Sequence, residues 1–568
     1  MADKDKSQAH DKQVLHKMGY AQELSRRMSG FSNFAISFSI ICILAGGISA
    51  FAAAFNSLGS GGAFMIWLVG GVLAMSVAFG MGQIASSFPT AGGLYHWSSH
   101  LGGKLWGWAT AWFNLIGLIC VVSSVDVLLY SIFFKGILLT DTLKMDTSTW
   151  GYWQQFFFVA VVLITQALLN HYGIELTTKV TDISGYLIFA LTIILIIGLF
   201  AFSPVKLDIS RLWTFTNFTG DAGGAVVPFR TESVAFAFLL GLVYVCYTIT
   251  GFDASAHTSE ETQDAQVNVP KGMWTAVFWS WVFGLVAVAA YVLTMPSIKD
   301  AAAAGWGSFD YMWNASLMPQ ALKIFLAVGL VAVNYMCALA GMTSCSRMMY
   351  AFSRDGGLPA SKSLARVSTQ FRTPTYAIWT SAGLALLSTV YAPYYLVLAV
   401  ACAVFLYISM VMPIAAGLLA EGTDKWKEKG PFNLGGFSKA NAVLAIIFGI
   451  TLAITGFFPP NEPVYYFTIF SIVAMLGLWS RKTAIYGIVI AVIGLVLSFF
   501  KVSDANVMHF LIPGSTTAYI TIAIAVITTA ITYMTGGEDN RFEGVPEGEK
   551  IAQRQKMIAD IEKKYGES

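Results

Sequence analysis

The sequence is short of charge. Asp, Glu, Lys and Arg make up 12% of its 568 residues and 56% of the residues are hydrophobic, whereas about 25% charged residues is usual in soluble domains. The formal net charge of +2 leaves no excess of basic residues to neutralise a phosphate backbone. These shortages exclude a nucleic-acid-binding protein and an ordinary soluble domain. They indicate a chain that crosses a membrane several times.

The patterns of several chemistries are also missing. We find no G-x-S-x-G elbow, no phosphate-binding loop and no intramembrane cluster of His, Asp and Glu that would serve an enzyme. A pore motif or a ring of charges, which a channel needs, is missing as well. We therefore expect neither an enzyme nor a resident cofactor or metal ion.

Cysteine pairs and a signal peptide are absent too. No two of the six cysteines form a C-x-x-C pair, and each lies in or beside an apolar run: Cys42, Cys120, Cys246, Cys337, Cys345 and Cys402. We expect small buried side chains rather than disulfides or metal ligands. The charged N-terminal stretch MADKDKSQAHDKQVLHK has no adjacent apolar core with a cleavage site, so no signal peptide is expected.

Long apolar runs, in contrast, fill the chain. About 20 mostly apolar residues suffice for a helix to span a bilayer. Such runs lie near 33–55, 63–86, 106–134, 154–170, 183–203, 234–254, 273–295, 321–350, 374–391, 394–419, 440–458, 463–480, 483–500 and 516–535. The last two are short, so the sequence predicts an all-α polytopic membrane protein with 12–14 transmembrane helices.

The distribution of Lys and Arg orients these spans. Most of the 34 basic residues fall in segments on the side of the N-terminus, and the bias remains when both termini are left out. By the positive-inside rule both termini are cytoplasmic, in a multi-pass protein of the plasma membrane. We expect a cytoplasmic segment at 1–30, a core at 31–420, additional helices at 421–535 and a charged tail at 536–568, either helical or disordered. The connection 204–233 is long enough to form a lid.

Two spans break their own apolar pattern. The first, ICILAGGISAF, places Gly46 and Gly47 side by side near its middle, and the sixth, YVCYTITGFDAS, brings in Thr250, Gly251 and Asp253. A broken helix survives in lipid only beside a cavity or packed protein. Because the two breaks lie five spans apart, they occupy matching positions in two five-helix halves. That arrangement is typical of a transporter site built from inverted repeats.

The broken ends predict the chemistry of the ligand. Free N–H groups of one half-helix attract a carboxylate, and free carbonyls of the other attract an ammonium group or a cation. A zwitterion such as an amino acid satisfies both without a buried charged side chain. Two simpler interpretations remain open. The glycine pair Gly46–Gly47 can allow close helix packing, and Asp253 can be an N-cap that accepts the N–H groups of Ser255 or Ala256.

Four stretches of the chain carry a family resemblance. They are SSFPTAGGLYHW at 86–97, GFDASAHTSEET at 251–262 followed by VNVPKGM at 267–273, SRMMYAFSRDGGLP at 346–359 and GPFNLG at 430–435. In this order they resemble the amino acid/choline transporter (GABA permease-like) family of the amino acid–polyamine–organocation superfamily, over about residues 20–480. The resemblance implies a LeuT-like 5+5 inverted repeat, at about 33–203 and 234–419, with additional C-terminal helices.

The resemblance also implies a binding site. Its carboxylate cradle falls on Gly46, Gly47, Ile48 and Ser49. Its amine side falls on the carbonyls of Cys42 and Ala45 together with Thr250, Gly251, Phe252 and Asp253. Phe252 resembles the aromatic residue that closes over the substrate in this fold.

Other polar residues within the spans leave alternatives open. Asp126 is a candidate to recognise an ammonium group, to carry a coupling proton or to reach outward to water. Ser123 and Ser124 either join the binding site or bond back to their own helix. Thr343 and Ser344 of span 8, with Ala45 of span 1, are candidates for a sodium site by resemblance.

The coupling ion, H⁺ or Na⁺, stays open at this stage. Some proton-coupled relatives place a lysine in span 5, but here DISGYLIFALTII has none and Lys179 comes earlier. After span 8, Arg347, Arg354 and Asp355 form either loop ion pairs or an inner gate. We expect transport of an amino acid or a related amine such as γ-aminobutyrate. Transport of choline, a polyamine or another organocation, and amino acid exchange, are the alternatives. The expected partners are the substrate and the lipid bilayer.

Overall fold

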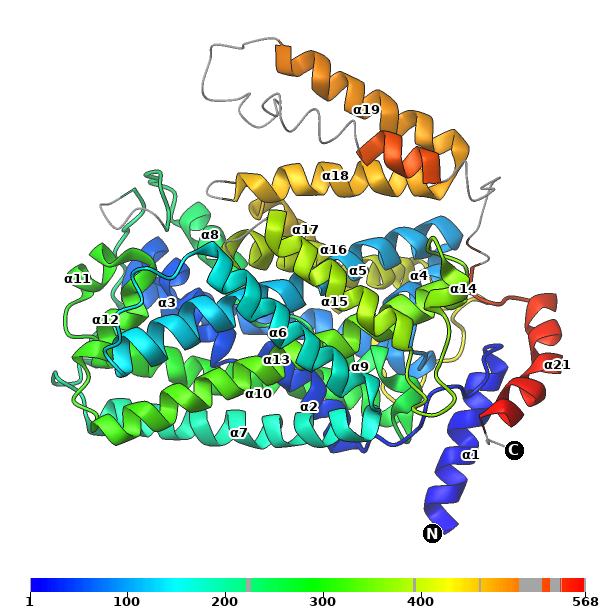
Figure 1. The fold of residues 1–568 in the computed structure, drawn as a ribbon, viewed down its shortest axis with the longest axis horizontal. Coiled ribbons are helices and arrows are strands. Elements are labelled where there is room, and N and C mark those ends of the chain that lie inside the picture. The colour runs from blue at the N-terminus through cyan, green and yellow to red at the C-terminus, as the bar shows by residue number, and fades with distance from the viewer. Residues whose placement is uncertain are drawn as a thin grey trace.

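The computed structural model describes residues 2–220, 226–391, 395–458, 461–499, 524–531, 542 and 544–565. Within these residues the protein is helical, and its only β-type contacts are two isolated bridges, Met28 with Thr262 and Glu421 with Trp426. The long helices run roughly side by side along the long axis of the molecule (Figure 1). Helix α1 (Ala2–Lys17) and helix α21 (Glu549–Lys564) lie together at one end, which we call the termini face.

The first half of the core contains five crossings. Its helices are α2 (Gly30–Ile41), α3 (Ala45–Ser87), α4 (Leu94–Gly102), α5 (Lys104–Leu128) with the π-helical η1 (Leu129–Thr142), α6 (Tyr152–His171) and α7 (Ile174–Ala201). Helix α3 bends at Leu58 and Gly59, where Gly59 has a φ of 71°. The bend separates the first crossing, which consists of α2 and the start of α3, from the second.

The second half repeats this order. Its helices are α8 (Val234–Thr248), α9 (Ala254–His257), η3 (Ser259–Glu261), α10 (Ala265–Thr294), α11 (Ile298–Ala303), α12 (Ser308–Ala315), α13 (Gln320–Arg354), α14 (Ser361–Leu364), α15 (Thr375–Tyr391) and α16 (Tyr395–Ala420). A broken helix again comes first, and a short helical connection again precedes the third crossing. The connecting helix α4 lies toward the termini face, whereas α11 and α12 lie at the opposite end (Figure 1). The two halves are therefore inverted, as expected for the 5+5 fold.

Length and composition agree with a polytopic membrane protein. Among the described residues, 8 helical segments are long and apolar enough to span a membrane, and one of them, Gly30–Ser87, contains the first two crossings. Shorter apolar helices add Val234–Thr248, Thr375–Val390, Val464–Trp479 and Lys482–Ile493. The predicted run 516–535 lies outside the described residues except for 524–531.

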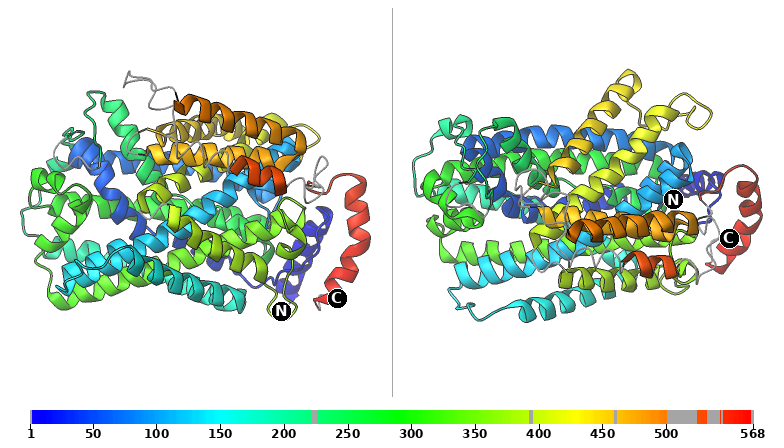
Figure 2. Two further views of the ribbon diagram at one scale, coloured as in Figure 1. Left: turned by 45° about the horizontal axis from the view of Figure 1, so that its top comes forward. Right: turned by 90° about the horizontal axis from the view of Figure 1, so that it is seen from above.

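After the core come α17 (Ser438–Thr455), α18 (Glu462–Trp479) and α19 (Arg481–Phe499), and residues 524–531 are helical as well. They form the yellow and orange layer on one side of the bundle (Figure 2). Helices α17 and α18 pack against α16, and Trp112 Nε1 of α5 donates to Ser471 O of α18 at 3.0 Å. Helix α17 also packs against α3 and α8.

The described part of the connection 204–233 covers the bend in α3. Thr216 N–H donates to Leu58 O at 3.0 Å, and Gly61 N–H donates to Thr214 O at 2.9 Å. A Cβ atom at Gly59 would lie 3.0 Å from the backbone of Thr216, so the close approach needs glycine. The segment thus closes the bend at the end opposite to the termini face.

Candidate functional site

The two helix breaks lie against each other in the centre of the molecule. Helix α2 ends at Cys42 in a left-handed conformation (φ 30°), and the break after α8 contains Gly251 at φ 83°. A Cβ atom on Gly46 would lie 2.7 Å from the Thr248 side chain, and one on Gly251 would lie 2.2 Å from Ile40. Close contact of the two backbones therefore depends on both glycines, and the matched breaks form one site.

A small cavity of about 20 Å³ lies where the breaks meet. Since roughly 10–15 Å³ accommodates one water molecule, the site is closed in this conformation. Its walls include the apolar Val121, Val125 and Leu128 of α5, and no charged side chain lines it. Thr250 also borders the cavity, and its Oγ1 is buried without a hydrogen-bond partner among the described residues. One donor and acceptor is thus available to a ligand.

The predicted carboxylate cradle is partly occupied by the protein itself. Gly46 N–H donates to Cys42 O at 2.9 Å, and Gly47 N–H donates to Ile43 O at 3.0 Å. The Ser49 hydroxyl donates back to Gly46 O at 3.0 Å. A substrate carboxylate can use the two glycine N–H groups only after the first turn of α3 loosens.

The other residues assigned by resemblance lie around the breaks. Ala45 borders the cavity, and Ile48 is buried one turn further along α3. Phe252 is fully buried, and its carbonyl accepts the Ser37 hydroxyl of α2 at 2.8 Å. Ser255 N–H donates to the same Ser37 hydroxyl at 3.0 Å. Helix α2 therefore holds the start of α9 in place.

The interpretation of Asp253 as a side-chain N-cap is wrong. Its backbone is helical (φ −66°, ψ −12°), whereas a capping side chain needs an extended backbone to reach the N–H groups of Ser255 or Ala256. The Oδ2 atom instead accepts Asn114 Nδ2 at 2.8 Å and lies 3.3 Å from His257 Nε2. The Oδ1 atom is buried and has no hydrogen-bond partner within the described chain.

Asp126 is held by helix α6. Its side chain is buried, and Oδ1 accepts Gln166 Nε2 of α6 at 2.8 Å. The outward-reaching alternative is therefore wrong. Asp126 is also not among the residues that line the cavity, although Val125 beside it is.

The serine hydroxyls of span 3 donate hydrogen bonds to carbonyl groups of their own helix. Ser123 donates to Ile119 O at 2.9 Å, and Ser124 donates to Val121 O at 3.1 Å. The back-bonding interpretation is confirmed for both. Ser124 also lies 3.2 Å from the Tyr247 hydroxyl of α8, so it links the third and sixth spans.

The three candidate residues of a sodium site, Ala45, Thr343 and Ser344, have different surroundings. Thr343 donates to Asn170 Oδ1 of α6 at 2.8 Å, and the same Oδ1 accepts Arg347 Nη1 at 3.2 Å. Ser344 Oγ is buried without a partner in the described part of the chain. Neither residue lines the cavity that Ala45 borders.

Buried ion pairs close the termini face. Arg347 donates to both carboxylate oxygens of Glu261, at 3.1 and 3.2 Å, and both side chains are 0% exposed. Arg354 pairs with Glu260 at 3.0 Å. The predicted ion pairing is present, but Arg347 lies inside α13 rather than in a loop and pairs with the end of the sixth span.

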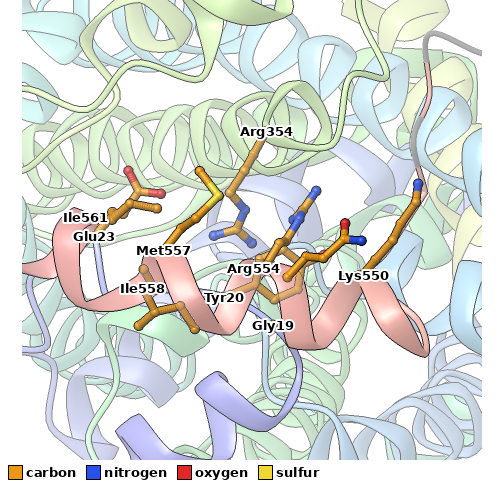
Figure 3. A pocket seen from close by; sticks show the side chains of 11 residues that line it. Gly19, Tyr20, Glu23, Arg354, Lys550, Arg554, Met557, Ile558 and Ile561 are labelled. Carbon is orange, nitrogen blue, oxygen red and sulfur yellow. The ribbon is translucent and has the colours of Figure 1, made fainter.

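The terminal segments complete this closure. Asp355 accepts the hydroxyls of Tyr20 and Tyr95, and it pairs with Arg554 of α21 at 3.0 Å. Burial and the Asp355 carboxylate raise the pKa of Tyr20 well above its usual value, so its phenol remains a donor. Helix α21 crosses this cluster beside Arg354 and borders an open pocket of about 460 Å³ (Figure 3).

The two residues that contact the Asp253 carboxylate, His257 and Asn114, are not among those predicted from the sequence. His257 lies one helical turn after Asp253 in the stretch GFDASAHTSEET, and this spacing places both side chains on one face. Asn114 had no such signal, since it comes from α5, 139 positions earlier in the chain. Only the packing of α5 against the break reveals it.

The sequence of this chain is similar to those of known proteins. The family model described as amino acid permease matches residues 28–480. The chain is 32% identical to the protein named amino-acid permease BAT1 of Arabidopsis thaliana over 489 residues, covering 82% of this chain and 92% of that protein. It is 32% identical to the amino-acid permease BAT1 homolog of Oryza sativa subsp. japonica (79% and 88% covered) and 25% identical to amino-acid permease 2 of Neurospora crassa (79% and 82%).

Proposed function

This chain belongs to the amino acid permease family, and on that premise we propose that it is a secondary active transporter of zwitterionic amino acids. Small apolar α-amino acids and γ-aminobutyrate are the substrates we propose. The protein carries them across the plasma membrane by alternating access, with both termini in the cytoplasm. It acts as a transporter rather than an enzyme.

One observation carries this proposal: the two helix breaks meet at a cavity without charged walls. The half-helix α3 begins there with its positive dipole end, and the carbonyl end of α8 lies beside it. Partial charges of both signs thus face one small volume. A molecule with one carboxylate and one ammonium group matches them, and the apolar walls suit a short aliphatic chain.

An organic cation fits this site less well. Choline or a polyamine needs an anionic side chain in the cavity wall, where a buried cation is otherwise costly. Asp126 is bonded to Gln166 on α6, and Asp253 is bonded to Asn114; neither lines the cavity. The positive end of α3 would repel such a ligand. We therefore favour the zwitterion over the cation.

Transport requires the site to open to each side in turn. At about 20 Å³ the cavity is too small for any amino acid, so binding must move α2 or the α8–α9 segment. The backbone at Cys42 and Gly251 is already left-handed and interrupts the two helices. We propose these positions as the hinges of alternating access.

Proteoliposome uptake tests the proposal. Purified protein should accumulate labelled alanine, leucine or γ-aminobutyrate above the external concentration, which a channel cannot do. Unlabelled zwitterions should compete, whereas choline and putrescine should not. Competition by choline and putrescine but not by zwitterions would contradict the proposed substrate class. Faster efflux into amino acid than into buffer would indicate exchange.

A further inference from the structure

A carboxylate and an imidazole are buried together one turn beyond the break. Asp253 and His257 are each 0% exposed, with Nε2 and Oδ2 3.3 Å apart. Burying such groups costs several kcal/mol compared with an apolar pair of similar volume. The stability of the fold therefore does not explain why this pair is buried. Its position beside the helix break indicates a role in function.

The surroundings of His257 fix how many protons the pair holds. His257 Nδ1 lies 3.3 Å from Ala91 O, and a carbonyl only accepts, so Nδ1 carries a hydrogen. The contact between Nε2 and Asp253 Oδ2 then needs one more proton, on either atom. With it the pair is neutral overall, as an ion pair or as imidazole and carboxylic acid. Without it the pair carries one negative charge.

Polar groups lie between the pair and the termini face. Toward the cavity, neither Asp253 Oδ1 nor Thr250 Oγ1 has a hydrogen-bond partner among the described residues. Toward the termini face, Ala91 N–H donates to Glu260 Oε1 at 3.0 Å, and Glu260 pairs with Arg354, which is 10% exposed. The backbone of Ala91 and the Glu260–Arg354 pair therefore separate His257 from water in this closed state.

The charged and titratable groups around the pair are few. On its own segment they are Glu260 and Glu261, which are neutralised by Arg354 and Arg347 of α13. Helix α16 contributes Cys402, helix α4 contributes Tyr95 and His96, and α10 contributes only the exposed Lys271 nearby. Helix α2 contains no titratable side chain, and α5 presents the neutral Asn114.

We propose that Asp253 and His257 form the coupling-proton site of this transporter. This inference rests on the proposed function. One proton binds between Oδ2 and Nε2 when the site faces one side, and it passes to water when the termini face opens and the pair becomes hydrated. Asn114 holds the carboxylate in the closed state, so movement of the α8–α9 segment relative to α5 changes the affinity for the proton. Substrate and proton are therefore carried together.

Proteoliposomes of the full-length protein with a pH dye inside test this site. With one proton per substrate and no membrane potential, a gradient of one pH unit, acid outside, supports about tenfold accumulation. Substrate addition to the wild type should also acidify the lumen. His257→Gln should reduce accumulation to about onefold and abolish the acidification, while exchange of labelled for unlabelled substrate at equal pH persists.

Controls separate the possible failures. His10→Gln changes an exposed histidine of α1 that bonds to Gln266 and should retain tenfold accumulation. Asp253→Asn should lower uptake far more than folded yield. Uptake by the wild type without proton movement would overturn the proton site even if His257→Gln does not fold. Unchanged gradient-driven accumulation in a folded His257→Gln protein would overturn it too. Absence of amino acid uptake in the wild type would instead contradict the proposed function.

Discussion

At the scale of single residues, the site contains a glycine that no larger residue can replace and a buried hydroxyl group without a hydrogen-bond partner among the described residues. Gly251 adopts φ 83° against Ile40, so its place admits no side chain. Thr250, next to it, keeps a buried hydroxyl without a partner among the described residues. A protein selected for stability alone would remove that hydroxyl. Its presence is understandable if a ligand supplies the missing hydrogen bond.

Gly251→Ala should destabilise the protein and abolish uptake. The left-handed backbone costs a non-glycine residue about 1–2 kcal/mol, and the added Cβ would lie 2.2 Å from Ile40. Thermal unfolding in detergent measures the loss. Gly383→Ala in α15 is the matched control, because a Cβ there meets no atom within 4 Å. Equal melting temperatures of the two variants would contradict the steric account.

Thr250→Val should separate stability from binding. Replacing a buried unpaired hydroxyl by a methyl group of the same shape removes a desolvation cost, so the melting temperature without substrate should rise or stay level. Loss of one hydrogen bond to the substrate should raise KM about tenfold. Uptake kinetics and thermal unfolding measure the two effects. An unchanged KM would show that the hydroxyl does not meet the substrate.

At the scale of elements, the terminal helices and the end of α13 form one closure. Arg554 of α21 and Tyr20 of the N-terminal segment both bind Asp355. The C-terminal Glu562 also accepts the backbone N–H of Gln22 at 2.9 Å. The position of the N-terminal segment thus depends on a helix more than 500 residues away in the sequence.

Arg554→Ala should therefore expose the N-terminal segment. Without its ion pair, α21 should detach more often and leave the partly buried Arg26 open to trypsin. Limited proteolysis followed by mass spectrometry measures the cleavage rate. Lys556→Ala, an exposed position of the same helix, is the control. Identical cleavage rates in the two variants would show that Arg554 does not hold the segment.

Helix α12, at the opposite end, should respond to pH. Burial, with a contribution from the Asp141 carboxylate, raises the pKa of Asp310 from 3.8 to about 7. The folded state therefore binds this proton more tightly than the unfolded chain, and stability falls as pH rises from about 4 to 7. Asp310→Asn should raise the melting temperature at pH 8 but not at pH 4. Asp300→Asn on α11 is the control, and an equal effect of Asp310→Asn at both pH values would contradict this assignment.

At the scale of the whole molecule, the protein is a closed inverted repeat with its cysteines near the centre. Cys337 and Cys402 border the cavity, whereas Cys345 is buried elsewhere on α13. A maleimide cannot enter a cavity of about 20 Å³. Modification of the first two thiols therefore reports opening of the molecule.

Saturating substrate should slow that modification. N-ethylmaleimide should label Cys337 and Cys402 faster than Cys345, and substrate should lower only the faster rates, because it fills the opened site. Mass spectrometry of peptides from the full-length protein measures each rate. Rates that are equal at all three thiols and independent of substrate would contradict opening at this cavity.

The sequence predicted the helices and both breaks because these are local properties. Apolar length determines a span, and Thr250–Gly251 marks the break of the sixth span. In the first span the break lies at 42–44, and Gly46 and Gly47, where it was expected, lie in the first turn of α3. The partners of Asp253 were not predictable in this way. Asn114 comes from α5 and Ser37, which takes over the capping, from α2. Such contacts arise only when distant helices pack, so the sequence around Asp253 does not show them.

The closed cavity has a consequence for every affinity measured on this protein. If only a fraction of the molecules is open enough to admit substrate, the apparent Kd equals the intrinsic Kd divided by that fraction. If about 1% of the molecules are open, a site with an intrinsic Kd of about 1 μM has an apparent Kd of about 100 μM. A substitution that loosens the contact between Gly46 and Thr248 would then bind substrate more tightly than the wild type while transporting it more slowly. Tight binding and fast transport are thus opposing demands on the same backbone contact.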